Sequence, residues 1–195
     1  MRLFQDINDP ELVELLRGGA VGVLPTDTVY GLVCRAADER AVKRLYDTKG
    51  RDGKPGTIIA ARIQQLVDLG VRARYLKAVE HFWPGPISII VPADLGYLNQ
   101  GVVGLALRIP GDDLLRELLR QTGALQTTSA NASSEPTATT VEAARAYFGD
   151  SVDFYVDGGD LSGRPPSTII RIVDDAIEII REGAVKIDEN GRVAR

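Results

Sequence analysis

The 195-residue sequence contains one cysteine, Cys34, and one histidine, His81. A single cysteine excludes an internal disulfide framework and a multi-cysteine metal site, and a single histidine excludes the usual histidine-rich zinc centres. No stretch approaches the ~20 apolar residues of a membrane-spanning helix, and the N-terminus becomes polar before any apolar run develops. We therefore expect an unexported protein of the reducing cytoplasm that has no membrane partner.

Standard phosphate-binding motifs are also missing. Gly53-Lys54 is followed by Pro55, which excludes a Walker loop, and no G-x-G-x-x-G opens a helix. His81 lies beside two aromatic residues, where we expect it to pack in the core. Without a second histidine or cysteine, the sequence offers no ready catalytic triad, and we assign no metal ligand.

The composition favours one folded domain. Apolar residues make up 44% of the chain, enough for a sizeable core, and no linker divides it, so we expect a single domain over residues 1–195. Its 23 lysine and arginine residues against 27 aspartate and glutamate residues give a formal net charge of −4. That balance argues against a protein held on nucleic acid mainly by bulk electrostatics, although it is compatible with a local basic cleft.

The hydrophobic pattern predicts helices and strands that alternate along most of the chain. A helix is expected between Asn8-Asp9-Pro10 and Gly18-Gly19, which supply an N-cap, a first-turn proline and closing glycines. Further helices are predicted at 39–46, 63–69, 73–82, 112–121 and 141–148, and strands at 20–24, 57–61, 87–91, 105–109, 124–128, 154–156, 167–173 and 177–180. Because strands cluster near the end, we expect an α/β fold with a mixed rather than purely parallel sheet.

We expect Lys49-Gly50-Arg51 to form an exposed loop rich in glycine and proline. Two basic residues at a helix end can simply complement the helix dipole. Alternatively they form a phosphate clamp, in which the lysine is a point charge, the arginine is a bidentate fork, and Lys54 adds a third cation. Such a clamp would also stabilise a departing polyphosphate.

Polar residues follow or end several predicted strands. Thr128-Ser129-Ala130-Asn131 offers hydroxyl and amide groups to a substrate, although such residues often only close turns. Thr26 and Thr28 have the same two interpretations, substrate contacts or ordinary β-branched residues around a turn at Asp27. Arg108 ends an apolar strand, so its charge needs a partner, which a substrate carboxylate or a buried aspartate would provide.

Seven short motifs occur in the order found in one family. They are Pro25-Thr26-Asp27-Thr28-Val29-Tyr30-Gly31-Leu32, Lys49-x-Arg51, Phe82-Trp83-Pro84-Gly85-Pro86, Leu107-Arg108-Ile109-Pro110, Ser129-Ala130-Asn131, Ser167-Thr168-Ile169-Ile170 and Arg181-Glu182-Gly183. Each motif alone is weak evidence, whereas the ordered set spans nearly the whole chain and is specific. On these motifs the chain resembles the YrdC-like, or TsaC-like, threonylcarbamoyl-AMP synthases in their short single-domain form.

The resemblance implies an enzyme, a nucleotidyltransferase that makes L-threonylcarbamoyl-AMP and pyrophosphate from ATP, L-threonine and bicarbonate or carbon dioxide. It also implies that Lys49 and Arg51 act in catalysis. The ATP contacts that it implies are Lys49, Arg51, Ser129, Asn131, Thr137 and Arg181, and the threonine contacts are Thr28, Arg108 and Ser167. The implied fold is a twisted, open, mixed α/β sheet flanked by helices, with the active site on its concave face.

The implied reaction needs no protein nucleophile, because threonine's own amine captures carbon dioxide and the carbamate oxygen then attacks the α-phosphorus. Magnesium (Mg2+) is expected with ATP, held by phosphate oxygens and water, so we assign it no protein ligand. The product would supply the machinery that installs threonylcarbamoyladenosine in tRNA. Two alternatives stay open: a module whose basic concave face binds RNA directly, and a paralogue that binds nucleotide without this activity.

Overall fold

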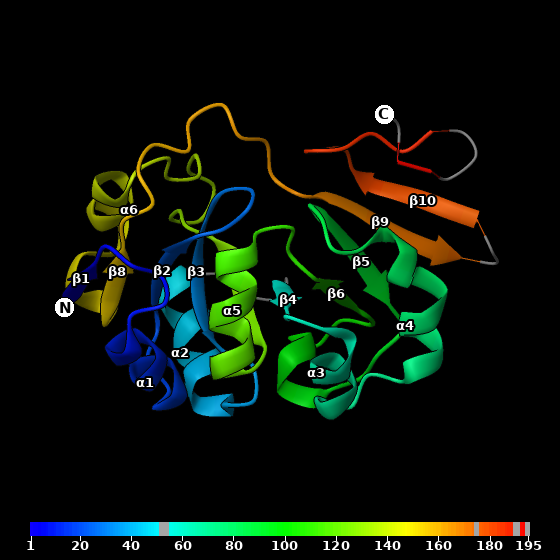
Figure 1. The fold of residues 1–195 in the computed structure, drawn as a ribbon, viewed down its shortest axis with the longest axis horizontal. Coiled ribbons are helices and arrows are strands. Elements are labelled where there is room, and N and C mark those ends of the chain that lie inside the picture. The colour runs from blue at the N-terminus through cyan, green and yellow to red at the C-terminus, as the bar shows by residue number, and fades with distance from the viewer. Residues whose placement is uncertain (51–54, 174–175, 189–191, 194–195) are drawn as a thin grey trace.

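A ten-stranded sheet forms the frame of the computed structural model, which describes residues 1–50, 55–173, 176–188 and 192–193 (Figure 1). The strands are β1 (Arg2–Phe4), β2 (Gly22–Pro25), β3 (Tyr30–Arg35), β4 (Thr57–Ile59), β5 (Ile87–Val91), β6 (Leu105–Arg108), β7 (Leu125–Ser129), β8 (Phe154–Val156), β9 (Thr168–Val173) and β10 (Ala176–Arg181). The α-helices are α1 (Pro10–Arg17), α2 (Glu39–Lys49), α3 (Ile63–Asp68), α4 (Ala73–Val79), α5 (Asp113–Thr122) and α6 (Val141–Phe148), and the 3-10 turns are η1 (Glu80–Phe82), η2 (Gly96–Asn99) and η3 (Gly149–Ser151).

The sheet is mixed and open, which confirms the predicted fold class. Its strands lie in the order β1-β8-β2-β3-β7-β4-β6-β5-β9-β10, with β1 at one edge and β10 at the other. Neighbours pair both parallel, as β4 with β6 and β5 with β9, and antiparallel, as β3 with β7 and β5 with β6. No helix in the described part of the chain is long and apolar enough to cross a bilayer.

Alternate residues of the central strands enter two apolar cores on opposite faces of the sheet. On β3, Leu32 and Cys34 belong to the core that includes residues of α2, α4 and α6, whereas Val33 belongs to the core that includes residues of α1 and α5. Helices thus lie on both sides of the sheet, as the alternating pattern of helices and strands requires.

Most predicted elements are present, and β5, β8 and α6 have the predicted bounds. The sequence does not predict β1 or β3. β1 has only three residues and is held by parallel pairing with β8, about 150 residues away. β3 is buried on both faces, so it lacks the polar alternation that identifies a strand.

Candidate active site

A row of paired residues across five strands forms the floor of a pocket of about 350 Å³. The row consists of Thr127 on β7, Thr57 on β4, Ala106 on β6, Ile90 on β5 and Arg171 on β9. Directly paired residues point to the same face of a sheet. Val33 continues the row on β3 and packs in the core with α1 and α5, so the pocket opens on that face, beside those helices.

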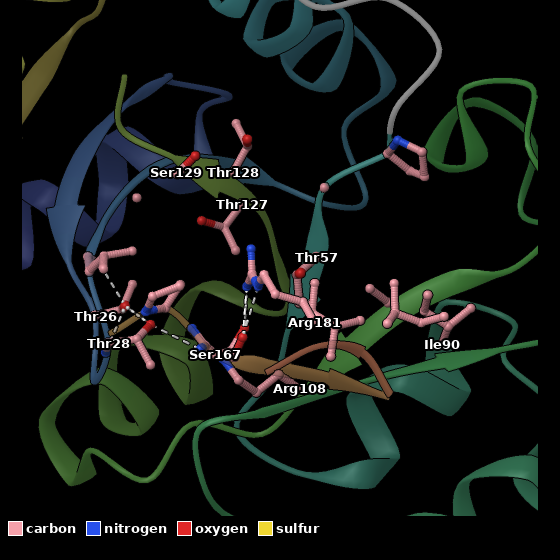
Figure 2. A pocket seen from close by; sticks show the side chains of 18 of the residues that line it. Thr26, Thr28, Thr57, Ile90, Arg108, Thr127, Thr128, Ser129, Ser167 and Arg181 are labelled. Carbon is pink, nitrogen blue, oxygen red and sulfur yellow. Dashed lines mark hydrogen bonds between the residues drawn. The ribbon is translucent and has the colours of Figure 1, made fainter. Parts of the chain in front are cut away.

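Hydroxyl groups gather toward one end of this pocket (Figure 2). Hydroxyl groups of Thr26, Thr28 and Ser129 lie toward one end, and Ile90 lies at the other. The lining includes three arginines, Arg108, Arg171 and Arg181, of which Arg171 pairs with Glu178 on β10 at 2.8 Å. The described residues that line the pocket include no acidic side chain. Although the chain as a whole is negatively charged, this pocket is suited to anions.

Arg108 is the most deeply buried of these cations, with only 4% of the residue exposed. Its Nη1 donates to Thr28 Oγ1 at 3.0 Å, and its Nη2 lies 3.4 Å from Asp27 Oδ1. Burial lowers the pKa of the Arg108 guanidinium, and the charge of Asp27 opposes that shift. Nε is buried and has no hydrogen-bond partner, whereas Arg108 as a residue lines the pocket.

Asp27 is the buried partner that the sequence allowed for Arg108, although its own pattern indicated only a turn. Its Oδ2 accepts a hydrogen bond from Gly111 N at 2.9 Å, and its side chain is 10% exposed. The two alternatives for Arg108 are compatible, because Asp27 balances the charge while Arg108 also lines the pocket.

Ser167 and Arg181 line the pocket from the end of the chain. Arg181 donates from Nε and Nη2 to the Ser167 carbonyl, at 3.2 and 2.7 Å, and from Nη2 to Ser167 Oγ at 3.2 Å. Ser167 Oγ also lies 3.0 Å from Ser88 Oγ on β5. These contacts bring together two residues that the sequence predicted for different substrates.

Tyr30 ties the segment before Ser167 to the pocket, a role that the sequence does not predict. This segment links β8 to β9 in an arc over one end of the strands (Figure 1). Tyr30 Oη donates to Gly159 O and accepts from Gly158 N, both at 2.8 Å. Burial raises the pKa of the Tyr30 phenol, although the hydrogen bond from Gly158 opposes the shift.

Lys49 does not lie in an exposed loop, which corrects the prediction. It is the last residue of α2, and Gly50 ends that helix in a left-handed conformation with φ 61°. Lys49 is 3% exposed, and its Nζ donates to Ser129 O, Asn131 O and Asn131 Oδ1 at 2.7, 2.6 and 2.7 Å. The buried position of Lys49 could not be predicted, because its carbonyl partners on Ser129 and Asn131 lie about 80 residues away in the sequence. Arg51 and Lys54 lie outside the described residues.

Asn131 and Thr137 belong to the loop after β7, and neither lines the pocket. Asn131 Oδ1 accepts from Ser129 Oγ at 2.6 Å, and its Nδ2 donates to Ala132 O and Glu135 O at 2.9 and 2.8 Å. Thr137 precedes Ala138, whose N–H bonds back to the Ala130 carbonyl at 2.8 Å. Asn131 therefore shapes the loop that presents Ser129, a function expected of an amide with donors and acceptors.

The remaining nucleophile candidates lie away from this pocket. Cys34 is fully buried in β3, where burial raises the pKa of its thiol. His81 is exposed and stacks on Phe82 with ring centroids 4.1 Å apart, so the prediction that it packs in the core was wrong. Among the described residues, no three histidine, cysteine, aspartate or glutamate side chains gather as a metal site.

Comparison with known proteins identifies the family. The Sua5/YciO/YrdC family model, which carries the description "telomere recombination", matches residues 14–183. The chain belongs to the Sua5/YciO/YrdC family. A threonylcarbamoyl-AMP synthase of Pseudomonas syringae is 35% identical over 86% of this chain and 93% of its own length. This confirms the resemblance stated above.

Two solved structures of Sua5/YciO/YrdC proteins have the same fold. Pyrococcus abyssi Sua5 complexed with L-threonine gives a TM-score of 0.80 at 28% identity, over 91% of this chain and 54% of Sua5. Escherichia coli YciO gives a TM-score of 0.80 at 26% identity, over 96% of this chain and 98% of YciO. The chain thus spans about half of Sua5 and nearly all of YciO.

Proposed function

We propose that the protein makes L-threonylcarbamoyl-AMP and pyrophosphate from ATP, L-threonine and bicarbonate or carbon dioxide. The observation that carries the proposal is a pocket with three arginines and many hydroxyl groups, in a chain of the Sua5/YciO/YrdC family. ATP and bicarbonate are anions, and threonine carries a carboxylate. A pocket whose described lining is cationic and free of carboxylates suits all of them.

We assign the threonine carboxylate to Arg108, because this arginine lines the pocket beside the Thr28 hydroxyl. Thr28 and Ser167 lie at the same polar end, so their hydroxyl groups would orient the rest of the amino acid. A charge-assisted hydrogen bond of this kind contributes about 1.5–3 kcal/mol, against about 0.5–1.5 kcal/mol for a neutral one. The carboxylate contact would therefore dominate threonine affinity.

We assign the nucleotide to Ser129, Arg181 and the cationic segment that begins at Lys49. The three hydrogen bonds of the Lys49 ammonium fix the Ser129 and Asn131 carbonyls, which makes Lys49 a positioning residue for this loop as well as a source of charge. Arg51 and Thr137 stay as predicted ATP contacts. Arg181 would close the nucleotide side of the pocket from β10.

The reaction then proceeds by placement of reactants. The neutral amine of threonine attacks the carbon of carbon dioxide, loses a proton and becomes a carbamate. A carbamate oxygen forms a bond to the α-phosphorus of ATP while the bond to pyrophosphate breaks. If bicarbonate is the source, one water molecule is released. The arginine cations would stabilise negative charge that develops on the phosphate oxygens.

Magnesium would accompany the ATP and balance charge on its phosphates. The described residues fit this assignment, since the pocket lining offers no carboxylate and no acidic cluster forms elsewhere among them. We therefore assign the ion to phosphate oxygens and water. A tRNA threonylcarbamoyl transferase system would consume the product, and direct RNA binding by this protein is an alternative that the test below addresses.

The test is product formation from ATP, L-threonine and labelled bicarbonate, resolved by chromatography. We expect labelled threonylcarbamoyl-AMP that depends on both ATP and threonine. Arg108→Lys should reduce it strongly, because lysine lacks the fork, whereas Arg120→Lys, in an exposed pair with Glu117, should not. ATP binding without product would favour the nucleotide-binding paralogue, and tight RNA binding without product would favour the RNA-binding module.

A further inference from the structure

Two buried threonine hydroxyls and one arginine form a chain of hydrogen bonds at the polar end of the pocket (Figure 2). Arg108 Nη1 lies 3.0 Å from Thr28 Oγ1, which lies 3.1 Å from Thr26 Oγ1. Thr26 Oγ1 in turn lies 2.7 Å from the Val29 carbonyl oxygen. Thr26 and Thr28 are 7% and 3% exposed, so these contacts are largely shielded from water.

Arg108 at one end of this hydrogen-bond chain and the Val29 carbonyl at the other fix the direction of every hydrogen bond between them. A guanidinium only donates and a carbonyl only accepts, whereas a hydroxyl has one proton to donate. Thr26 therefore donates its proton to Val29 O and must accept from the Thr28 hydroxyl. Thr28 donates to Thr26 and accepts from Arg108. The Thr26 oxygen also accepts from Thr28 N at 3.2 Å, which fills its acceptor capacity.

The Thr28 hydroxyl therefore keeps one acceptor lone pair, and it has no proton left to donate to a ligand. Beside it, the guanidinium of Arg108, which can only donate, belongs to a residue that lines the pocket. A donor and an acceptor side by side complement the carboxylate and a donor group of one α-amino acid. An isolated threonine hydroxyl would not discriminate in this way, because it can rotate to donate or accept.

We propose that Thr26 is a positioning residue that fixes the Thr28 hydroxyl as an acceptor, so that Thr28 selects a hydrogen-bond donor on the amino-acid substrate. The inference rests on the proposed function and deepens it. Threonine offers two such donors, its amine and its side-chain hydroxyl. A carbonyl or a second carboxylate presented to Thr28 would meet a lone pair instead and be disfavoured.

The test compares Thr26→Val, which keeps the shape of the side chain and removes its hydroxyl, with Thr26→Ser, which keeps the hydroxyl. We expect Thr26→Val to raise the KM for threonine about 3- to 10-fold, as the loss of one neutral hydrogen bond predicts. The KM for ATP should stay within about twofold. Thr26→Ser should restore wild-type values, and calorimetry of threonine binding without ATP should show the same order.

Thr122→Val is the matched control. It also removes a buried threonine hydroxyl that donates to a carbonyl, here Leu118 O at 3.0 Å, but it lies on α5 outside the pocket lining. It should lose stability without a change in the KM for threonine. Should Thr26→Val fail to fold, Thr26→Cys, with a weaker donor of similar size, should show the same loss of affinity to a smaller degree.

L-2-Aminobutyrate, which lacks the hydroxyl group of threonine, identifies the donor. If Thr28 accepts from the hydroxyl, Thr26→Val lowers the preference for threonine over 2-aminobutyrate, and if it accepts from the amine, both substrates lose affinity equally. Unchanged KM and preference in Thr26→Val, or equal losses in Thr26→Val and Thr26→Ser, would overturn the inference. A wild-type protein that binds threonine with this preference but makes no product would contradict the proposed function alone.

Discussion

At Arg108, burial and charge act against each other. The guanidinium is almost completely enclosed, and Asp27 is the counter-charge that the described residues place within 4 Å of it. Removing one partner of a buried ion pair is costly because the other charge is left without compensation. The stability of this region therefore depends on Asp27 as much as on Arg108.

We predict that Asp27→Asn lowers the free energy of unfolding by about 3 kcal/mol, although the amide can still accept from Gly111 N. The KM for threonine should also rise, since Arg108 loses its orientation. Urea unfolding and steady-state kinetics measure the two effects. Asp47→Asn, in an exposed pair with Lys43, should cost at most about 0.5 kcal/mol, and similar losses in both variants would contradict the buried-pair argument.

Lys49 differs from a surface cation because it is buried and donates to oxygens of Ser129 and Asn131. Lys49→Met should remove the ammonium from three oxygens, of which Ser129 O keeps the Asn131 N–H and Asn131 Oδ1 keeps the Ser129 hydroxyl. The buried Asn131 carbonyl loses the donor that Lys49 gives it, and a buried group left unsatisfied costs about 1–3 kcal/mol. We expect both a lower melting temperature and lower turnover, measured on the same preparation. Lys43→Met, on the exposed face of α2, is the control and should change neither the melting temperature nor turnover by much. Loss of turnover without loss of stability in Lys49→Met would instead favour the interpretation of Lys49 as part of a phosphate clamp.

Five residues that motif order assigned to substrates, Thr28, Arg108, Ser129, Ser167 and Arg181, line the pocket. What the sequence could not provide is the pairing among them. The sequence indicated only a turn at Asp27, whereas in the structure Asp27 pairs with Arg108. It likewise predicted a loop at Lys49, whereas Lys49 ends α2 and donates to the Ser129 carbonyl. Such partners come from distant parts of the chain, and local spacing contains no information about them.

At the scale of elements, the Tyr30 phenol is one of the contacts that hold the segment between β8 and β9, together with the buried Leu161, whose N–H donates to Thr139 O at 2.8 Å. Tyr30 contacts it through Gly158 and Gly159, and Ser167 lies where the segment enters β9. Tyr30 is the first residue of β3, a strand that the sequence did not predict. β3 is buried on both faces, so it lacks the alternation of polar and apolar residues that identifies a strand.

Tyr30→Phe should therefore loosen this segment without removing the ring from the core. We expect faster amide hydrogen exchange at Gly158, a loss of about 1 kcal/mol in the free energy of unfolding, and a higher KM for threonine through Ser167. Tyr155→Phe removes an equivalent phenol contact, to Gly149 O at 2.9 Å outside the pocket lining, and should affect stability alone. Equal kinetics for Tyr30→Phe and wild type would show that the segment is held by other contacts.

For the molecule as a whole, buried thiol and phenol groups determine the response to alkali. Burial raises the pKa of Cys34, and it raises the pKa of Tyr155 to about 12. These groups bind their protons more tightly in the folded state than in the unfolded chain, where cysteine and tyrosine titrate near about 8.5 and 10. Their contribution to stability is thus complete below those values and is lost as the pH rises through the folded ones.

We predict that the free energy of unfolding falls with rising pH above about pH 9, with Cys34 responsible for the first part of the decline. Denaturant titrations at several pH values measure this slope. Cys34→Ala should flatten it between about pH 8.5 and 10 and leave the tyrosine part above about pH 10. An unchanged slope in Cys34→Ala would show that its thiol titrates normally.

The floor of the pocket has a consequence for how the protein becomes active. Thr57, Ala106, Thr127 and Arg171 are brought into one row from positions up to 114 residues apart, so no fragment and no partly folded chain can present the site. Substrates can bind only after the last central strand has joined the sheet. A ligand at about 100 times its Kd would then add about 2.7 kcal/mol to the free energy needed to open the central sheet. The stabilisation would apply to the whole central sheet and not to a single loop. Bound substrate would thereby protect the folded protein from proteolysis that requires this opening.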